Sequence, residues 1–238
     1  MYQLYIANKN YSSWSLRPWV LMSELQIGFQ ERMTPFGDDA AWQALRRLFP
    51  SGKVPCLQDD ELRVWDSLAI LEYLAERHTG VWPRESAARA WARSAAAEMH
   101  SGFAALREHC SMSCGIRLRL RERPAALARD LERLTALWLE GLARFGGPFL
   151  AGERFCAVDA CFAPVAFRVQ TYGLDLAGAA AAYAQRLLQL RSMQAWYAAA
   201  LAEPLREAAH ETHVLAQGTL LQDLRVAPSA APVQPAPA

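Results

Sequence analysis

Apolar positions in the first 78 residues follow two different periods. Tyr2–Ala7 is rich in β-forming residues and predicts a buried strand, and Phe29–Pro35 predicts a second. Between them, Leu16–Ile27 carries apolar residues three and four apart and ends at Gly28, which predicts an amphipathic helix. The same analysis then predicts a short helix around Trp42–Leu48, strands at Val54-Pro55 and Leu62–Trp65, and a helix from Ser67. The order β-α-β-α-β-β-α predicts an α/β domain over residues 1–78.

The second half of the chain shows only the helical period. Trp91, Ala95, Met99, Phe103, Leu106 and Cys110 recur three and four apart and predict one long helix. Further helices are expected from Pro124 to Gly146 and over Ala157–Tyr172, Ala179–Leu190 and Ser192–Ala202. We therefore expect a linker at residues 79–84 and an all-helical domain over residues 85–215. Residues 216–238 end in a run rich in proline and alanine, and we expect this tail to be disordered.

Composition narrows the choice of partners. Of the 238 residues 53% are apolar, and the formal net charge of +1 gives no general attraction for nucleic acid or an anionic membrane. No apolar run reaches membrane-spanning length, and the first residues do not have the pattern of a signal peptide. The five cysteines include no Cys-x-x-Cys pair, and His109, Cys110 and Cys114 fit one helix better than a metal site. We expect a cytoplasmic protein without a metal, nucleic-acid or membrane partner.

Two short motifs, Val54-Pro55 and Asp66-Ser67, carry the candidate chemistry. A cis Val54–Pro55 bond would turn the N–H and C=O of Val54 out of the sheet, toward the backbone of an extended peptide. At a helix start, Asp66 can accept an ammonium group while Ser67 and free N–H groups hold a carboxylate. An ordinary turn and an ordinary N-cap would explain either motif alone. Together, they favour a site for a small peptide with a free amino-acid head.

Val54-Pro55, followed by Asp66-Ser67 and an apolar helix, resembles the glutathione-binding half of soluble glutathione S-transferases. The resemblance implies a thioredoxin-like first domain followed by a helical bundle, and a cis bond before Pro55. It implies glutathione as co-substrate, with its γ-glutamyl end at Asp66 and Ser67 and its glycine carboxylate at Lys53. It also implies a homodimer.

The segment Phe149–Asp159 adds to the resemblance. Members of the family begin a buried helix here with Ser or Thr facing an Asp three residues later, and this chain has Cys156 before Asp159. A thiol is a weak acceptor, which weakens this capping box. We expect the fold to survive because Asp159 can still accept hydrogen bonds from backbone N–H groups.

The loop after the first strand holds the catalytic hydroxyl in this family, and here it offers Tyr11, Ser12, Ser13 and Ser15. Ser-Ser-Trp-Ser-Leu-Arg resembles the Ser-Ser-Cys-x-x-Arg pattern of zeta-class enzymes, with Trp14 in place of the cysteine. That match favours Ser12 as the catalytic hydroxyl. Counting back from Arg17, as in the other serine classes of the family, favours Ser13 instead. Tyr11 ranks third, and Ser15 ranks fourth as the expected helix cap. A hydrogen bond of about 1.5–3 kcal/mol to the glutathione sulfur would lower its pKa by about one to two units.

The resemblance places an acceptor pocket between the domains, lined by Trp14, Met99, Phe103, Arg168 and Thr171. Zeta-class isomerases carry an arginine for their diacid substrate at the position that Thr171 occupies here, and Arg168 lies one turn earlier. We expect a glutathione S-transferase of the detoxification type, which adds the glutathione thiolate to a small, largely apolar electrophile. Two alternatives stay open. One is a cis–trans isomerase of the maleylacetoacetate type, and the other is a non-catalytic protein that binds glutathione or apolar ligands.

Overall fold

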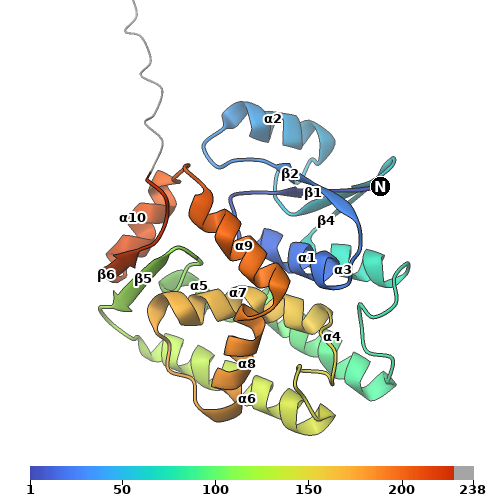
Figure 1. Cartoon of the computed structure of the whole chain (residues 1–238), viewed down its shortest axis with the longest axis vertical. Coiled ribbons are helices and arrows are strands. Elements are labelled where there is room, and N and C mark those ends of the chain that lie inside the picture. Colours follow the sequence, from blue (N-terminus) through green and yellow to red (C-terminus); the bar gives the residue numbers. More distant parts are fainter. Residues whose placement is uncertain (228–238) are drawn as a thin grey trace, which may run out of the picture.

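A four-stranded mixed sheet forms the upper part of the molecule in Figure 1, a computed structural model that describes residues 1–227. The strands are β1 (Tyr2–Ile6), β2 (Phe29–Met33), β3 (Cys56–Asp59) and β4 (Leu62–Trp65), in the order β2-β1-β3-β4. Strand β1 runs parallel to β2 and antiparallel to β3, and β3 pairs antiparallel with β4. This is the thioredoxin-like arrangement that the sequence predicts.

Three helices complete the first part of the chain: α1 (Ser13–Glu24), α2 (Asp39–Leu48) and α3 (Ser67–Ala75). Helix α1 starts at Ser13, three residues before the predicted start at Leu16. Its apolar residues Leu16, Val20 and Leu21 are buried, and it packs against α3 of the same domain and α7 of the next. The start of α1 is therefore held at the boundary between the two parts of the chain.

Helices dominate the second part of the chain, as predicted, and pack beneath the sheet (Figure 1). They are α4 (Ser86–Ser101), α5 (Ala104–His109), α6 (Ala125–Phe145), α7 (Ala157–Tyr172), α8 (Gly178–Leu188), α9 (Arg191–Ala202) and α10 (Ala208–Ala216). Helix α7 is buried along almost its whole length and contacts α1, α4 and α8, so it is the centre of the bundle. Within residues 1–227, no helix has both the length and the apolar character needed to cross a membrane.

The long helix expected over Trp91–Cys110 is in fact two helices, α4 and α5. Phe103 adopts a left-handed backbone conformation with φ of 58°, which an α-helix cannot contain. A Cβ atom at Gly102 would lie 2.8 Å from the Glu98 carbonyl oxygen, so only glycine fits this close approach. The apolar spacing of three and four continues across the break because both helices face the same core.

Two strands that the sequence analysis missed lie among the helices: β5 (Ile116–Leu120) and β6 (Gly218–Asp223), paired antiparallel. Ile116 and Leu118 are buried while Arg117 and Arg119 are not, which is the alternation of a half-buried strand. The expectation of an all-helical segment over 85–215 therefore needs correction at β5. The expected disorder from residue 216 is corrected by β6, and residues 228–238 of that tail lie outside the described residues.

Asp159 anchors the start of α7 as expected. One of its carboxylate oxygens, Oδ1, accepts from the Leu150 N–H (3.0 Å) and the Tyr183 hydroxyl (2.8 Å), and Oδ2 accepts from the Cys156 N–H (3.0 Å). Burial raises the pKa of Asp159 to about 6, and these hydrogen bonds oppose that rise. The carboxylate thus compensates for the weak Cys156 cap.

Replacing Asp159 by Ala should lower the free energy of unfolding by about 3 kcal/mol or more, because each buried group left unsatisfied costs about 1–3 kcal/mol. Urea denaturation measures the change. Asp175→Ala is the control, since this carboxylate is exposed and pairs with Arg123 at the surface. Its expected effect is below about 1 kcal/mol. Equal, small effects in both variants would show that Asp159 does not hold α7.

Candidate active site

A cavity of about 580 Å³ lies between the first domain and α4. It is lined by Trp14, Ser51, Lys53, Val54, Pro55, Trp65, Asp66 and His100. The structure thus brings the two motifs, Val54-Pro55 and Asp66-Ser67, to one place and adds a histidine from the helical domain. A cavity with a charged residue of each sign suits a small zwitterionic ligand.

Val54 and Pro55 form one wall of this cavity, and the peptide bond between them is cis, as expected. Within residues 1–227, the N–H and C=O of Val54 form no hydrogen bond, so both are available to the backbone of a bound peptide. The Cys56 thiol, one residue further on, donates to the Lys53 carbonyl (2.9 Å), and burial raises its pKa to about 12. Cys56 is therefore a structural residue and not a nucleophile.

Asp66 is the N-cap of α3 and stands at the cavity mouth. Its Oδ1 accepts from the Leu68 N–H (2.8 Å), while Oδ2 lies 3.4 Å from Nε2 of His100, and half of the side chain is exposed. Burial is the largest cause of a lowered His100 pKa, which Asp66 partly offsets. The Ser67 hydroxyl is buried and has no partner within the described residues. Asp66 can therefore accept a cation, and the Ser67 hydroxyl next to it in the sequence is free to bond with a ligand.

The candidate hydroxyls of the β1–α1 loop differ in what they contact. The Tyr11 hydroxyl donates to Glu211 (2.6 Å), and burial, with this hydrogen bond, raises its pKa to about 12. The Ser12 hydroxyl donates to Oγ of Ser15 (2.7 Å), which also accepts from the Ala7 N–H. The Ser13 oxygen accepts from the Arg168 guanidinium (3.4 Å), and its own proton has no acceptor within residues 1–227. Ser13 is therefore the hydroxyl best placed to donate to a ligand.

Trp14 lines the cavity, whereas its neighbours Ser12 and Ser13 do not. Its ring lies between two guanidinium groups, with Arg17 at 4.2 Å and Arg107 at 4.7 Å from the ring centroid. The His100 ring meets Trp14 edge-on at 5.1 Å. These contacts hold the Trp14 ring in place at the floor of the cavity, and Ser13 directly precedes it in the sequence.

Three arginines lie next to Trp14 or Ser13: Arg17 and Arg107 contact the Trp14 ring, and Arg168 contacts the Ser13 hydroxyl. Burial is the largest cause that lowers the pKa values of Arg17 and Arg168 to about 10, and their like charges lower them further. None of the three forms an ion pair with a carboxylate within residues 1–227, and Nε of both Arg17 and Arg168 has no hydrogen-bond partner there. A buried positive cluster without its anions suits a ligand that carries negative charge.

The other residues predicted for the acceptor pocket lie elsewhere. Met99 and Phe103 are buried in the core and do not line the cavity. The Thr171 hydroxyl donates to the Ser113 carbonyl (2.8 Å), and Thr171 lines a separate cavity beside β5. Conversely, the sequence analysis missed Ser51, Trp65 and His100, which carry no motif and are brought in by the loop before β3, the end of β4 and the end of α4.

Both the sequence and the fold of this chain are similar to those of known proteins. Residues 11–77 match the family model described as "Glutathione S-transferase, N-terminal domain". The first domain is thus similar to the N-terminal domain of glutathione S-transferases. Solved structures share the fold over most of the described chain. One is the theta class glutathione S-transferase from Xanthomonas axonopodis pv. citri with glutathione bound, at 24% identity and a TM-score of 0.61, covering 82% of this chain and 96% of that one. Another is a glutathione transferase from Methylococcus capsulatus, at 22% identity and a TM-score of 0.63, covering 84% and 98%.

Two curated relatives of this glutathione transferase-like chain carry the name of an isomerase. The maleylacetoacetate isomerase of Rhizobium meliloti (strain 1021) is 32% identical over 143 residues, which cover 54% of this chain and 63% of the relative. The probable maleylacetoacetate isomerase of Caenorhabditis elegans is 25% identical over 181 residues, covering 73% of this chain and 81% of the relative. The reaction has to be argued from the site.

Proposed function

We propose that this chain is a glutathione-dependent enzyme in which Ser13 activates the glutathione thiol for addition to an electrophile. Glutathione would lie along Lys53–Pro55, with its γ-glutamyl ammonium at Asp66 and the γ-glutamyl carboxylate at Ser67. The free backbone groups of Val54 and the uncommitted hydroxyl of Ser67 support this placement. The glutathione-bound structure of the Xanthomonas relative, which shares the fold, supports the choice of ligand.

The observation that carries the proposal is the environment of Ser13. It is the first residue of α1, so free N–H groups and the positive end of the helix dipole lie beside it. Arg168 donates to its oxygen, which leaves the hydroxyl proton for the sulfur. A thiolate that accepts this proton in a hydrogen bond is stabilised by about 1.5–3 kcal/mol, and the helix adds up to about 1 kcal/mol. From a reference value near 8.5, these effects bring the thiol pKa to about neutral pH.

Isomerisation is the second candidate, and the arginine cluster favours it. Both reactions begin when the thiolate adds to an electrophilic carbon. In transfer the adduct is the product, whereas in isomerisation a single bond rotates and the thiolate is expelled again. A diacid substrate needs cations, and Arg17, Arg107 and Arg168 supply three without paired carboxylates. The cluster thus favours an electrophile with a negative group over the largely apolar one expected from the sequence.

A homodimer in the cytoplasm completes the proposal. Leu62 and Trp65 on the edge strand β4 are about half exposed, which leaves apolar surface for a second copy. The five cysteines are all buried, unpaired thiols, which agrees with a reducing compartment.

Ser13→Ala should raise the thiol pKa of bound glutathione by about one to two units while changing its dissociation constant little. Ser12→Ala is the matched control, with a smaller expected shift because its proton is used by Ser15. Ultraviolet difference titration of the thiolate measures both. A shift confined to Ser12→Ala would transfer the role to Ser12. An ordinary thiol pKa in the wild-type protein would favour the non-catalytic alternative.

Arg168→Gln should separate the two reactions. For maleylacetone, loss of one charged hydrogen bond predicts a fall in kcat/KM of about 10- to 100-fold. For the neutral electrophile 1-chloro-2,4-dinitrobenzene the fall should be smaller, because Arg168 then loses its contacts with Ser13 and the Cys110 carbonyl but no contact with a charged substrate. Arg123→Gln is the control, since Arg123 pairs with exposed Asp175 away from the cavity. No glutathione-dependent isomerisation by the wild-type protein would leave transfer as the reaction.

A further inference from the structure

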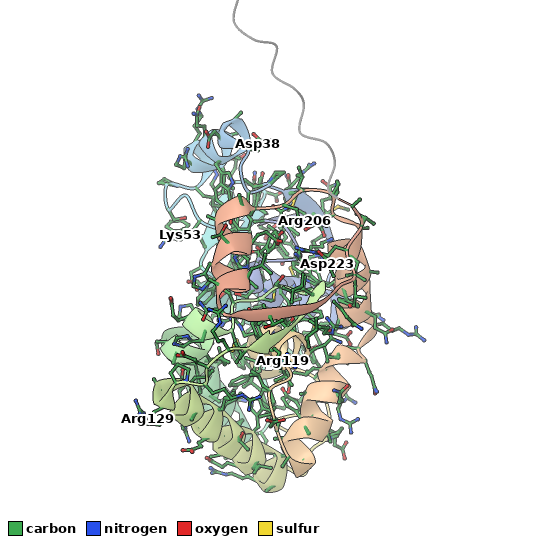
Figure 2. The ribbon with its side chains drawn as sticks, turned by 90° about the vertical axis from the view of Figure 1, so that its left-hand side faces the viewer. Asp38, Lys53, Arg119, Arg129, Arg206 and Asp223 are labelled. Carbon is green, nitrogen blue, oxygen red and sulfur yellow. The ribbon has the colours of Figure 1, made fainter. Side chains whose placement is uncertain are left out.

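After α9, the last described segment of the chain packs against the loop between β1 and α1, near the N-terminus. Residues Glu203–Val226, here called the C-terminal strap, comprise a turn, α10 and β6 and lie over one side of the molecule (Figure 2). The Leu224 N–H donates to the Gly115 carbonyl and the Val226 N–H donates to the Leu201 carbonyl, both at 2.9 Å. Arg206 links the two ends of the strap by donating to the carbonyl oxygens of Glu203 (2.6 Å) and Val226 (2.5 Å). The strap is thus a closed, hydrogen-bonded unit.

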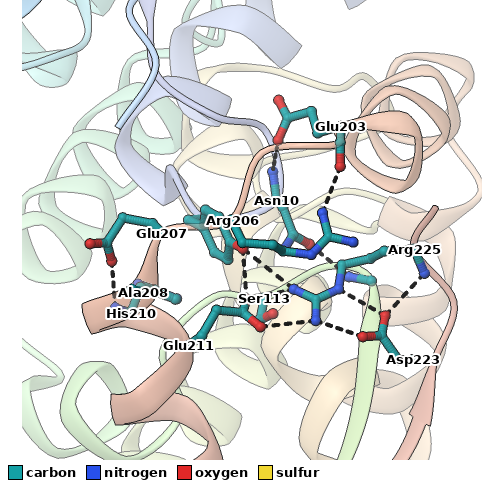
Figure 3. Close-up of polar contacts among 12 residues, drawn as sticks. Asn10, Ser113, Glu203, Arg206, Glu207, Ala208, His210, Glu211, Asp223 and Arg225 are labelled. Atoms are coloured by element: carbon teal, nitrogen blue, oxygen red, sulfur yellow. Dashed lines mark hydrogen bonds and ion pairs between the residues drawn. The ribbon is translucent and has the colours of Figure 1, made fainter. Parts of the chain in front are cut away.

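The start of the strap holds the backbone of the loop between β1 and α1. The Glu203 carboxylate accepts from the N–H groups of Lys9 (2.7 Å) and Asn10 (3.2 Å), one with each oxygen, and Figure 3 shows Glu203 next to Asn10. The Trp196 indole of α9 donates to the Lys9 carbonyl (2.8 Å). On the other side of the loop, the Gly115 N–H donates to the Asn10 side chain (2.9 Å). The loop is therefore fixed by groups from the helical domain that lie about 100 residues or more away in the sequence.

The end of the strap holds the residue that precedes the two serines. The Tyr11 hydroxyl donates to Glu211 of α10, and Arg225 pairs with both oxygens of that carboxylate. Asp223 in turn pairs with Arg225 through Nε (2.8 Å) and Nη2 (2.7 Å). The Arg225 side chain at the centre of this network is only 5% exposed, whereas Glu211 is 21% and Asp223 39% exposed (Figure 3). A shielded ion pair holds its geometry better than a surface pair.

We infer that the C-terminal strap positions Ser13, with Glu203 and Glu211 as its two positioning residues. The inference rests on the proposed function, because it assigns the strap to the hydroxyl that activates the thiol. Inside the loop, the N–H groups of Tyr11 and Ser12 both donate to the Asn8 carbonyl, at 3.1 and 2.9 Å. Because this tight turn is rigid, a shift of Lys9–Tyr11 also shifts Ser13, two residues further along the chain. A small displacement there weakens the hydrogen bond to sulfur without touching the residues that hold glutathione.

Two variants of the full chain test the inference. Glu203→Gln keeps the size of the side chain, but an amide has one acceptor oxygen and would turn its NH2 group toward the other backbone N–H. Tyr11→Phe removes only the hydroxyl that joins the loop to Glu211 and leaves the Arg225 pair in place. Arg133→Gln is the matched control, because it breaks another two-pronged arginine–glutamate pair, with Glu98, that does not touch the loop.

Three quantities are measured on each folded variant: backbone hydrogen exchange over residues 8–13, the thiol pKa of bound glutathione, and the glutathione dissociation constant. In both strap variants we expect exchange to rise about tenfold and the thiol pKa to rise by about 0.5–1 unit. The glutathione dissociation constant should change by less than about twofold, since the proposed glutathione-binding residues Lys53–Pro55, Asp66 and Ser67 lie outside the loop that the strap contacts. The control variant should match the wild type in all three.

The alternative outcomes are separable. A lower melting temperature with an unchanged thiol pKa and unchanged exchange in both strap variants would show that the strap is only structural and overturn the inference. Faster exchange with an unchanged thiol pKa would overturn it as well, because the loop would move without consequence for the sulfur. An ordinary thiol pKa in the wild-type protein would contradict the proposed function, and the inference would fail with it.

Discussion

Packing of α1 against α7 is the contact on which the rest of the structure depends. Both helices are largely buried, and they come from different halves of the chain. Their contact brings Arg168, late in α7, to Ser13, the first residue of α1. The same packing closes the cavity by placing α4 and His100 opposite Asp66. Hydrophobic burial along α7 therefore determines the polar geometry of the candidate site.

The electrostatics of the site follow from what the protein leaves unpaired. Buried polar and charged groups are normally satisfied within a protein, and each exception calls for a partner. Among the unsatisfied buried groups of residues 1–227 are the Ser67 hydroxyl, Nε of Arg17 and of Arg168, and Nδ1 of His100, and of these His100 lines the cavity. Glutathione and an anionic second substrate would supply carboxylates and a thiolate to this region.

Local sequence signals predicted the first domain, the cis Val54–Pro55 bond and the N-cap at Asp66, which meet at one cavity. Val54-Pro55 and Asp66-Ser67 are short motifs whose function depends on backbone geometry nearby, so their spacing is informative. His100 and Arg107 could not be assigned in this way, because only the tertiary contact of α4 and α5 with the first domain brings them to Trp14. Strand β5 was missed because its alternation spans five residues between longer helical stripes. Its partner β6 lies about 100 residues away, beyond any local pattern.

A crystal structure of the complex with glutathione tests the central claim most directly, since Trp14 lines the cavity and Ser13 does not. The account predicts that the sulfur lies within about 3.5 Å of the Ser13 hydroxyl oxygen, with the γ-glutamyl ammonium at Asp66. It also predicts that the Trp14 ring moves aside or turns edge-on to admit the sulfur. A sulfur atom held on the far side of an unmoved Trp14, without contact to Ser13, would contradict the account.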